Sequence, residues 1–339
     1  MFRSAANPLI RVALFPVLLL FWQHVFGTDL PLLAPAMCAV FLTTTHQPPP
    51  FIMVVLMAAV LSVTAWLQVA IDNRFADYPH LYYLTLFAVF YWCMERTKKN
   101  PQDVFAILLI VSTAMIATFS RQQGMNVGDI PQALWSNIWV GGFVAYLAYW
   151  LFPDGTPLAP QKASPTSNVQ YLFDWQIFVK ALVLLVVLVV CMNFELEQTT
   201  IITVVVGLII KDVDPVVGHD YGARRFLATF ASVLYAIPTL IACILQVNLI
   251  GTLGITLVSA MYMGIHAQQK QASYNSIQLM YTSFVVLIFY PVTATSISAL
   301  ADNTERFASI LLAVIIGWLT LLMLSSRNSL IKADRDNSN

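Results

Sequence analysis

Two polar stretches carry most of the side chains that could take part in chemistry, and each follows a short apolar segment. The first is Thr43-Thr44-Thr45-His46, directly after the apolar residues 30–42. The second follows residues 198–210 and holds the titratable residues Lys211, Asp212, Asp214, His219, Asp220, Arg224 and Arg225. Basic and hydroxyl groups could receive an anionic substrate here, while a histidine or Asp214 could exchange a proton. The same residues would also suit a solvated cytoplasmic loop, so both interpretations stay open.

A second pair of titratable residues, Glu95 and His266, occupies matching places in the two halves of the chain. Glu95 follows FYWCM and His266 follows MYMGI, so each comes where an aromatic-rich helix is expected to meet the lipid headgroups. The pair could relay protons, or each residue could anchor its helix at the interface. Three glutamines lie nearer the apolar zone and could bond to a ligand or to a neighbouring helix, namely Gln68, Gln246 and Gln278.

The sequence lacks the motifs of several other classes of protein. It has no GxxxxGK[ST] phosphate loop, no HExxH zinc motif and no GxSxG nucleophile motif. Its four cysteines lie in apolar stretches without CxxC spacing, and its formal net charge is zero. We therefore expect a protein that is not an enzyme, needs no metal or other cofactor, and does not bind nucleic acid.

The candidate residues must be positioned by membrane helices. Of the 339 residues, 59% are hydrophobic and only 10% are charged, and the mean hydropathy is +0.74. Apolar runs begin near residues 8, 30, 51, 79, 102 and 132, and again near 174, 198, 222, 249, 274 and 304. The second set follows the first at offsets of 166 to 172 residues, which indicates an internal repeat. At about this offset Arg11 is matched by Lys180 and Ser62 by Ser232.

These patterns predict an all-α polytopic membrane protein with about twelve transmembrane helices in two parallel six-helix repeats. We expect residues 1–152 to form the first repeat and residues 174–325 the second. Residues 153–173 would be a proline-rich cytoplasmic linker, and residues 326–339 a polar cytoplasmic tail.

The two short apolar segments are expected to lie at the centre of the bundle. Thirteen residues of helix cover roughly 20 Å, whereas the hydrocarbon core is about 30 Å thick. Such a helix must be shielded by neighbours or line a water-filled cavity. Paired short segments at matching places in two halves point to the central site of a transporter.

The distribution of basic residues favours short segments that span the membrane. With twelve spans, the cytoplasmic side holds 14 lysines and arginines, and the outer side holds 3, which are Arg74, Arg121 and Arg306. Both termini are then cytoplasmic. If the short segments re-entered instead, the split would be 11 against 6, so re-entry is the less favoured alternative.

Two copies of a six-span unit with a short second span, together with the stretch GARRFLATFASVLYA at residues 222–236, resemble the fusaric acid resistance and aromatic acid exporter family. The resemblance covers nearly the whole chain. Arg224 and Arg225 match the basic start of that family's third span, and Asp214 lies in the preceding polar turn. Larger members carry a soluble cytoplasmic domain, in place of which this chain has only its short linker.

The resemblance implies a bacterial inner membrane protein that exports hydrophobic or aromatic organic acids. It also implies coupling to the proton gradient and a periplasmic adaptor of the membrane fusion type as partner, and a homo-oligomer stays open. Two alternatives remain. The protein could be a non-transporting scaffold that recruits an envelope partner, or a membrane-embedded transferase that acts on lipid-linked substrates.

Overall fold

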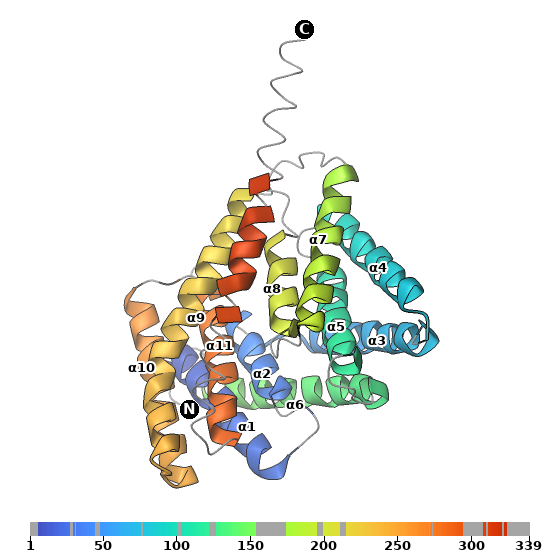
Figure 1. The fold of residues 1–339 in the computed structure, drawn as a ribbon. Helices are drawn as coiled ribbons and strands as arrows, with labels where there is room; N and C mark the ends of the chain where they lie inside the picture. Colours follow the sequence, from blue (N-terminus) through green and yellow to red (C-terminus); the bar gives the residue numbers. More distant parts are fainter. Residues whose placement is uncertain are drawn as a thin grey trace. The chain divides into compact units, whose positions relative to one another are not determined.

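The computed structural model is all-helical over the residues that it describes (Figure 1). These are residues 6–27, 30, 32–44, 48–75, 77–99, 103–121, 127–153, 174–194, 199–210, 215–270, 272, 274–293, 308–309, 311–320 and 322–323. Five helices are long and apolar enough to cross a membrane, and four further apolar helices are shorter. The chain is therefore a helical membrane protein.

The first half contains α1 (Asn7–Phe26), α2 (Leu33–Thr44), α3 (Phe51–Phe75), α4 (Pro79–Lys99), α5 (Val104–Arg121), the 3-10 turn η1 (Val127–Asp129) and α6 (Ile130–Leu151). The second half contains α7 (Asp174–Asn193), α8 (Thr199–Ile210), α9 (Pro215–Ile244), α10 (Leu249–Gln269) and α11 (Tyr274–Thr293). A further apolar helix covers Leu311–Thr320.

Most helices start within three residues of the predicted positions. The main exception is α9, which begins at Pro215, whereas the apolar run was predicted to begin near residue 222. Proline suits the first turn of a helix, where its missing N–H costs no hydrogen bond. The polar sequence that follows, VVGHDYGARR, hides this start from a search for apolar runs.

The chain forms two compact units, and neither unit corresponds to one half of the sequence. Unit 1 consists of residues 1–59, 132–162 and 224–307, and unit 2 of residues 60–131, 163–223 and 308–339. Each unit therefore combines helices from both halves. Three helices, α3, α6 and α9, contribute residues to both units.

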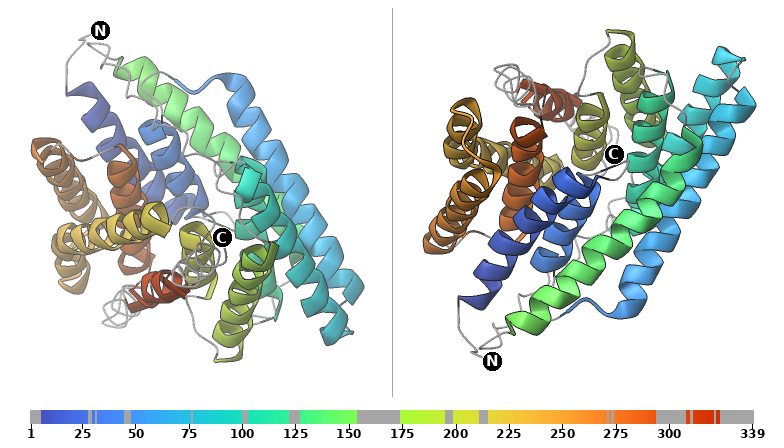
Figure 2. Two further views of the ribbon diagram at one scale, coloured as in Figure 1. Left: turned by 90° about the horizontal axis from the view of Figure 1, so that it is seen from above. Right: turned by 90° about the horizontal axis from the view of Figure 1, so that it is seen from below.

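In unit 1, α1 packs along α2, α10 and α11, and α11 in turn packs against α2 and α10. The helices α1 and α2, drawn in blue, lie side by side in both views of Figure 2. α10 approaches its neighbours closely at Gly264, where an added Cβ would clash with the Tyr281 hydroxyl of α11 and lie 3.0 Å from Leu9 of α1. The Tyr281 hydroxyl donates to the Ala260 carbonyl of α10 at 2.9 Å.

The same set of contacts recurs in unit 2 with different helices. There α7 packs along α8, α4 and α5, and α5 in turn packs against α8 and α4. The apolar core of this unit is formed by buried side chains of these four helices together with Ala313. Thus α7, α8, α4 and α5 take the places that α1, α2, α10 and α11 hold in unit 1.

The helices differ sharply in exposure. Among the described residues, α2, α8 and α11 have no exposed side chain, and α5 has one, Arg121 at its end. The other long helices present large apolar side chains outward, such as Ile52, Phe143 and Ile250. Such surfaces suit lipid rather than water.

Candidate functional site

Each unit has a candidate site of its own at an interior helix pair, which is α2 with α11 in unit 1 and α8 with α5 in unit 2. We call these the interior pairs. Each contains one 12-residue helix, and at about 1.5 Å per residue that helix is only about 18 Å long. The prediction of two short, enclosed helices is confirmed over the described residues.

Glycines allow neighbouring helices to approach the short helices closely. At Gly141 of α6, an added Cβ would lie 2.8 Å from the Ala34 carbonyl oxygen and 3.2 Å from the Cys38 amide nitrogen of α2. At Gly207 of α8, it would lie 3.1 Å from Ile110 of α5 and 3.4 Å from Leu184 of α7. Gly141 thus faces the backbone of α2, whereas Gly207 faces side chains of α5 and α7. Close packing at small residues stabilises membrane helices, which gain no hydrophobic drive from lipid.

Hydroxyl groups are the main polar groups of the interior pairs. Thr43 of α2 donates to the Ala39 carbonyl at 2.7 Å, and Thr113 of α5 donates to the Leu109 carbonyl at 2.6 Å. Such bonds within one helix satisfy the hydroxyl without joining helices. Thr203 of α8 is fully buried, and its hydroxyl has no hydrogen-bond partner among the described residues. A buried hydroxyl without a partner is costly, which makes Thr203 a candidate contact for a ligand.

A buried cation fixes the end of α6 in unit 1. Arg11 is 1% exposed, donates to the Phe152 carbonyl at 3.0 Å, and lies 4.0 Å over the ring of Tyr149. Asn7, one turn earlier, donates to the Pro153 carbonyl at 2.7 Å. Cations and donors at a helix carboxyl end neutralise its unpaired carbonyls.

The matching helix of unit 2 carries the same kinds of residue. Gln176 and Lys180 of α7 are 5% and 4% exposed and have the same spacing as Asn7 and Arg11. The sequence had indicated the correspondence of Arg11 and Lys180, but it did not reveal their burial. A basic residue at a membrane interface normally extends its charge to water, so apolar context alone could not have shown it.

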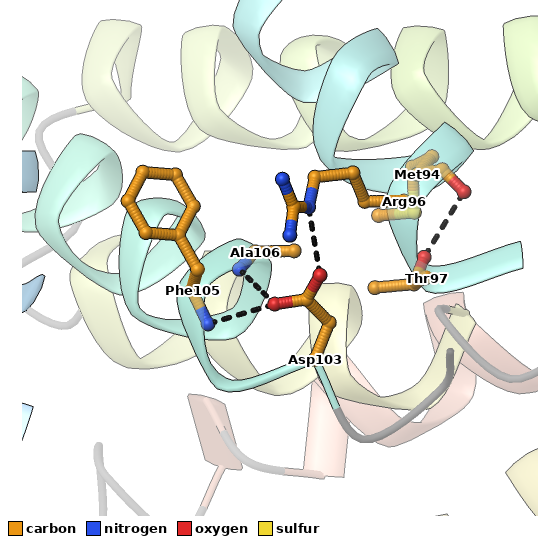
Figure 3. A network of polar contacts seen from close by, with 6 residues as sticks. All are labelled: Met94, Arg96, Thr97, Asp103, Phe105 and Ala106. Carbon is orange, nitrogen blue, oxygen red and sulfur yellow. Dashed lines mark hydrogen bonds and ion pairs between the residues drawn. The ribbon is translucent and has the colours of Figure 1, made fainter. Parts of the chain in front are cut away.

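An ion pair closes the turn between α4 and α5 (Figure 3). The Arg96 Nε atom lies 2.7 Å from the Asp103 carboxylate, which also accepts the backbone N–H groups of Phe105 at 3.0 Å and Ala106 at 3.4 Å. Asp103 therefore caps the amino end of α5. The Arg96 guanidinium also lies over Trp92.

These contacts set the protonation of Asp103. Partial burial raises the pKa of its carboxyl, but the hydrogen bond from Arg96 and those from the two backbone N–H groups outweigh this effect and hold the pKa below its usual value. Because Arg96 is exposed and packs against aromatic side chains, we interpret the Arg96–Asp103 pair as a structural contact between α4 and α5 at the surface.

A second ion pair joins the carboxyl-terminal ends of α3 and α5 in unit 2. The Asp72 carboxylate of α3 accepts the Ser120 hydroxyl and lies 3.3 Å from Arg121 Nε. The side chain of Asp72 is 8% exposed and that of Arg121 is 28% exposed. The Arg121 guanidinium also lies 4.4 Å over the ring of Tyr82 in α4. Sequence analysis missed Asp72, although Thr64, Gln68 and Asp72 form a polar stripe at four-residue spacing.

The structure describes only part of the predicted site. Thr44 is the last residue of α2, and its side chain lies outside the described residues, as do Thr45, His46, Lys211, Asp212 and Asp214. The stretch around them is therefore still a prediction.

The remaining candidates are distributed over both units. Arg224 is exposed and Arg225 partly buried on α9 of unit 1, and Arg225 Nε has no hydrogen-bond partner among the described residues. His266 is exposed on α10 of unit 1, with its ring 6.3 Å from that of Tyr235. Glu95 is partly buried near the end of α4, in unit 2.

Comparison with models of protein families gives a match to part of the chain. The sequence model of a family described as "Protein of unknown function (DUF2955)" matches residues 8–148, which extend from the first turn of α1 into α6. No curated protein and no solved structure gives a significant match to the chain. The match names no exporter family, so the resemblance to aromatic acid exporters stays an expectation.

Proposed function

We propose that this protein is a bacterial inner membrane transporter that exports small hydrophobic or aromatic organic acids. The observation that supports the proposal most directly is the pair of enclosed 12-residue helices, α2 and α8. A helix of about 18 Å is shorter than a hydrocarbon core of about 30 Å, so it must be shielded by its neighbours or line a water-filled cavity. The proposal places the organic acid in a cavity of this kind. In transporters built from repeats, such paired helices contribute to the substrate site.

The proposal includes twelve spans in two six-helix repeats that exchange helices. Matching helices have equal or similar lengths: α1 and α7 have 20 residues each, α2 and α8 have 12, and α4 and α10 have 21. Their packing partners also match, as described above. Unit 1 then combines helices one, two and six of the first repeat with helices three, four and five of the second, and unit 2 has the converse set.

The orientation follows from the basic residues. With both termini in the cytoplasm, Arg224 and Arg225 lie on the cytoplasmic side at the start of the apolar part of α9. There they would attract an organic anion toward the inner mouth, together with Lys211. Proton coupling and a periplasmic adaptor of the membrane fusion type belong to the proposal through the resemblance alone.

Transport by inverted inner membrane vesicles tests the proposal. We expect vesicles that contain the protein to accumulate a labelled aromatic acid, such as benzoate, when a pH gradient is imposed. Vesicles from the deletion strain are the control. If no acid of a broad panel accumulates, even with adaptor proteins present, the transporter assignment fails and a scaffold role becomes the better explanation.

A further inference from the structure

We propose that the carboxyl-terminal end of α4 binds an anionic phospholipid, with the lipid phosphate on the Arg96 guanidinium and an acyl chain along the exposed face of α4. The surface lies wholly in unit 2. The inference goes beyond the proposed function, because it concerns a lipid of the surrounding membrane and requires no transport.

The Arg96 guanidinium is held in one orientation with most of its donors unused. Its Cζ atom lies 5.1 Å from the centre of the Trp92 ring and 5.5 Å from that of Phe105, and the two rings meet edge to face. Its one hydrogen bond among the described residues runs from Nε to the Asp103 carboxylate, as Figure 3 shows. Both Nη groups keep their N–H donors for another partner, and the side chain is 45% exposed. A phosphate group accepts paired N–H bonds from such a guanidinium.

An exposed apolar face of α4 leads up to this cation. Leu84, Ala88 and Trp92 are exposed and follow one another at four-residue spacing, and Arg96 continues the series. Residues four apart lie on one face of a helix. From Leu84 to Arg96 the helix rises about 18 Å, which is close to the roughly 15 Å of hydrocarbon in one leaflet. The face therefore matches the form of a phospholipid, with an apolar length and a charged group at its end.

The charges near Arg96 favour an anionic lipid over a zwitterionic one. Residues 95–103 hold three basic and two acidic side chains, so this segment has a positive formal charge. Positive segments next to a membrane helix attract anionic headgroups, whereas the amine of a zwitterionic headgroup would be repelled. Tryptophan prefers the interface between hydrocarbon and headgroups. Trp92 lies one turn before Arg96 and so places the guanidinium at the depth of the lipid phosphates.

Lipid binding to the full-length protein, released from detergent micelles and counted by native mass spectrometry, tests the inference. We expect phosphatidylglycerol to bind about five times more tightly than phosphatidylcholine with the same acyl chains. Arg96→Gln should lower the affinity for phosphatidylglycerol about fivefold, to that for phosphatidylcholine. Trp92→Leu keeps the charge but removes the ring that orients it, and should lower the affinity about twofold to threefold.

Asp103→Asn distinguishes lipid binding from a purely structural role of Arg96. This variant breaks the same ion pair as Arg96→Gln, but it keeps a good helix cap and removes a negative charge beside the guanidinium. We therefore expect Asp103→Asn to bind phosphatidylglycerol more tightly, whereas Arg96→Gln binds it less tightly. Lys270→Gln is the control, because it removes an exposed cation from the end of α10 in unit 1 and should leave the affinity unchanged.

Equal affinity of the wild type for the two lipids would overturn the inference, as would a change in the same direction for Arg96→Gln and Asp103→Asn. Displacement of phosphatidylglycerol by soluble glycerol 3-phosphate would also overturn it, because the surface would then recognise a free phosphate. If Arg96→Gln does not fold, Trp92→Leu and Asp103→Asn still provide the two opposite changes. None of these results depends on export in vesicles, so the lipid site and the transporter assignment can fail separately.

Discussion

Asp103 combines two stabilising roles in one side chain, because it caps α5 and pairs with Arg96 of α4. Replacement by alanine removes both roles, whereas replacement by asparagine keeps a good helix cap and removes only the charge. We expect Asp103→Ala to lower stability by about 1 kcal/mol. Asp103→Asn should cost clearly less. Thermal unfolding can be followed by a thiol-reactive dye, because Cys38, Cys93 and Cys191 are buried in the folded protein.

The contribution of Asp103 to stability should depend on pH in one direction. The folded-state pKa of Asp103 lies below its unfolded value of about 3.9, so its contribution is fully present above that value. The contribution is lost as the pH falls through the lower, folded-state value. The difference in stability between the wild type and Asp103→Ala should therefore shrink below about pH 4. An undiminished difference at acid pH would show that the charge of Asp103 has no part in it.

The proposed attraction of an organic anion to a cytoplasmic mouth can be tested at Arg224 and Arg225. Their joint replacement by glutamine should lower export of an organic acid by roughly threefold to tenfold, because positive potential raises the encounter rate. The loss should shrink as the ionic strength rises, since salt screens the attraction. Initial rates in inverted vesicles at low and high salt measure both effects. Unchanged export, at an unchanged amount of inserted protein, contradicts this role.

The sequence does not reveal which of its charged residues are buried in the folded protein. Asp72 and Arg121 lie near the ends of apolar helices, where side chains normally reach water or headgroups. Ser120 and Arg121 of α5 contact Asp72, and Tyr82 of α4 lies against Arg121, so the burial of Asp72 depends on contacts far apart in the sequence. A polar stripe such as Thr64, Gln68 and Asp72 was the one local signal available.

At the scale of elements, the close contact of α6 with α2 depends on Gly141. An added methyl group would lie 2.8 Å from a carbonyl oxygen of α2, and the backbone of a packed helix cannot move away cheaply. We therefore expect Gly141→Ala to lower the Tm by several degrees. The dye assay of the buried cysteines measures the shift.

Gly254 of α10 provides the matched control, because an added Cβ there would have no atom within 4 Å. Alanine is the better helix former by about 1 kcal/mol, so Gly254→Ala should leave the Tm unchanged or raise it slightly. Equal loss of stability in both variants would show that the contact with α2 is not the cause.

Apolar runs located the helices but not their partners. The starts of α3, α4, α7, α10 and α11 agree with the predicted positions, because a membrane helix must be apolar over most of its length. The start of α9 was missed, because its first two turns are polar. Nothing in such runs specifies that α4 packs on α7 or α1 on α10, since lipid-facing and helix-facing surfaces are equally apolar.

At the scale of the whole molecule, the exchange of helices makes each unit depend on both halves of the chain. Helix α4 of the first half packs against α7 of the second half, and α1 packs against α10. A protein of two independent halves would instead bury each half's helices against one another. The distinction affects how the chain can be divided.

Division of the chain within the linker, between residues 162 and 163, should therefore yield two fragments that need each other. Expressed alone, the fragment of residues 1–162 has α1 without α10 and α4 without α7, so we expect it to be degraded or to aggregate, with its cysteines open to the dye. Expressed together, the fragments should purify as a 1:1 complex whose cysteines are protected as in the intact chain. The variant Gly207→Leu in the second fragment should weaken that complex. Ile110 of the first fragment lies against this glycine, so a leucine side chain would push the two helices apart. A stable, folded monomer of residues 1–162 would contradict the exchanged arrangement, since the packing of α1 on α10 and of α4 on α7 would then be dispensable.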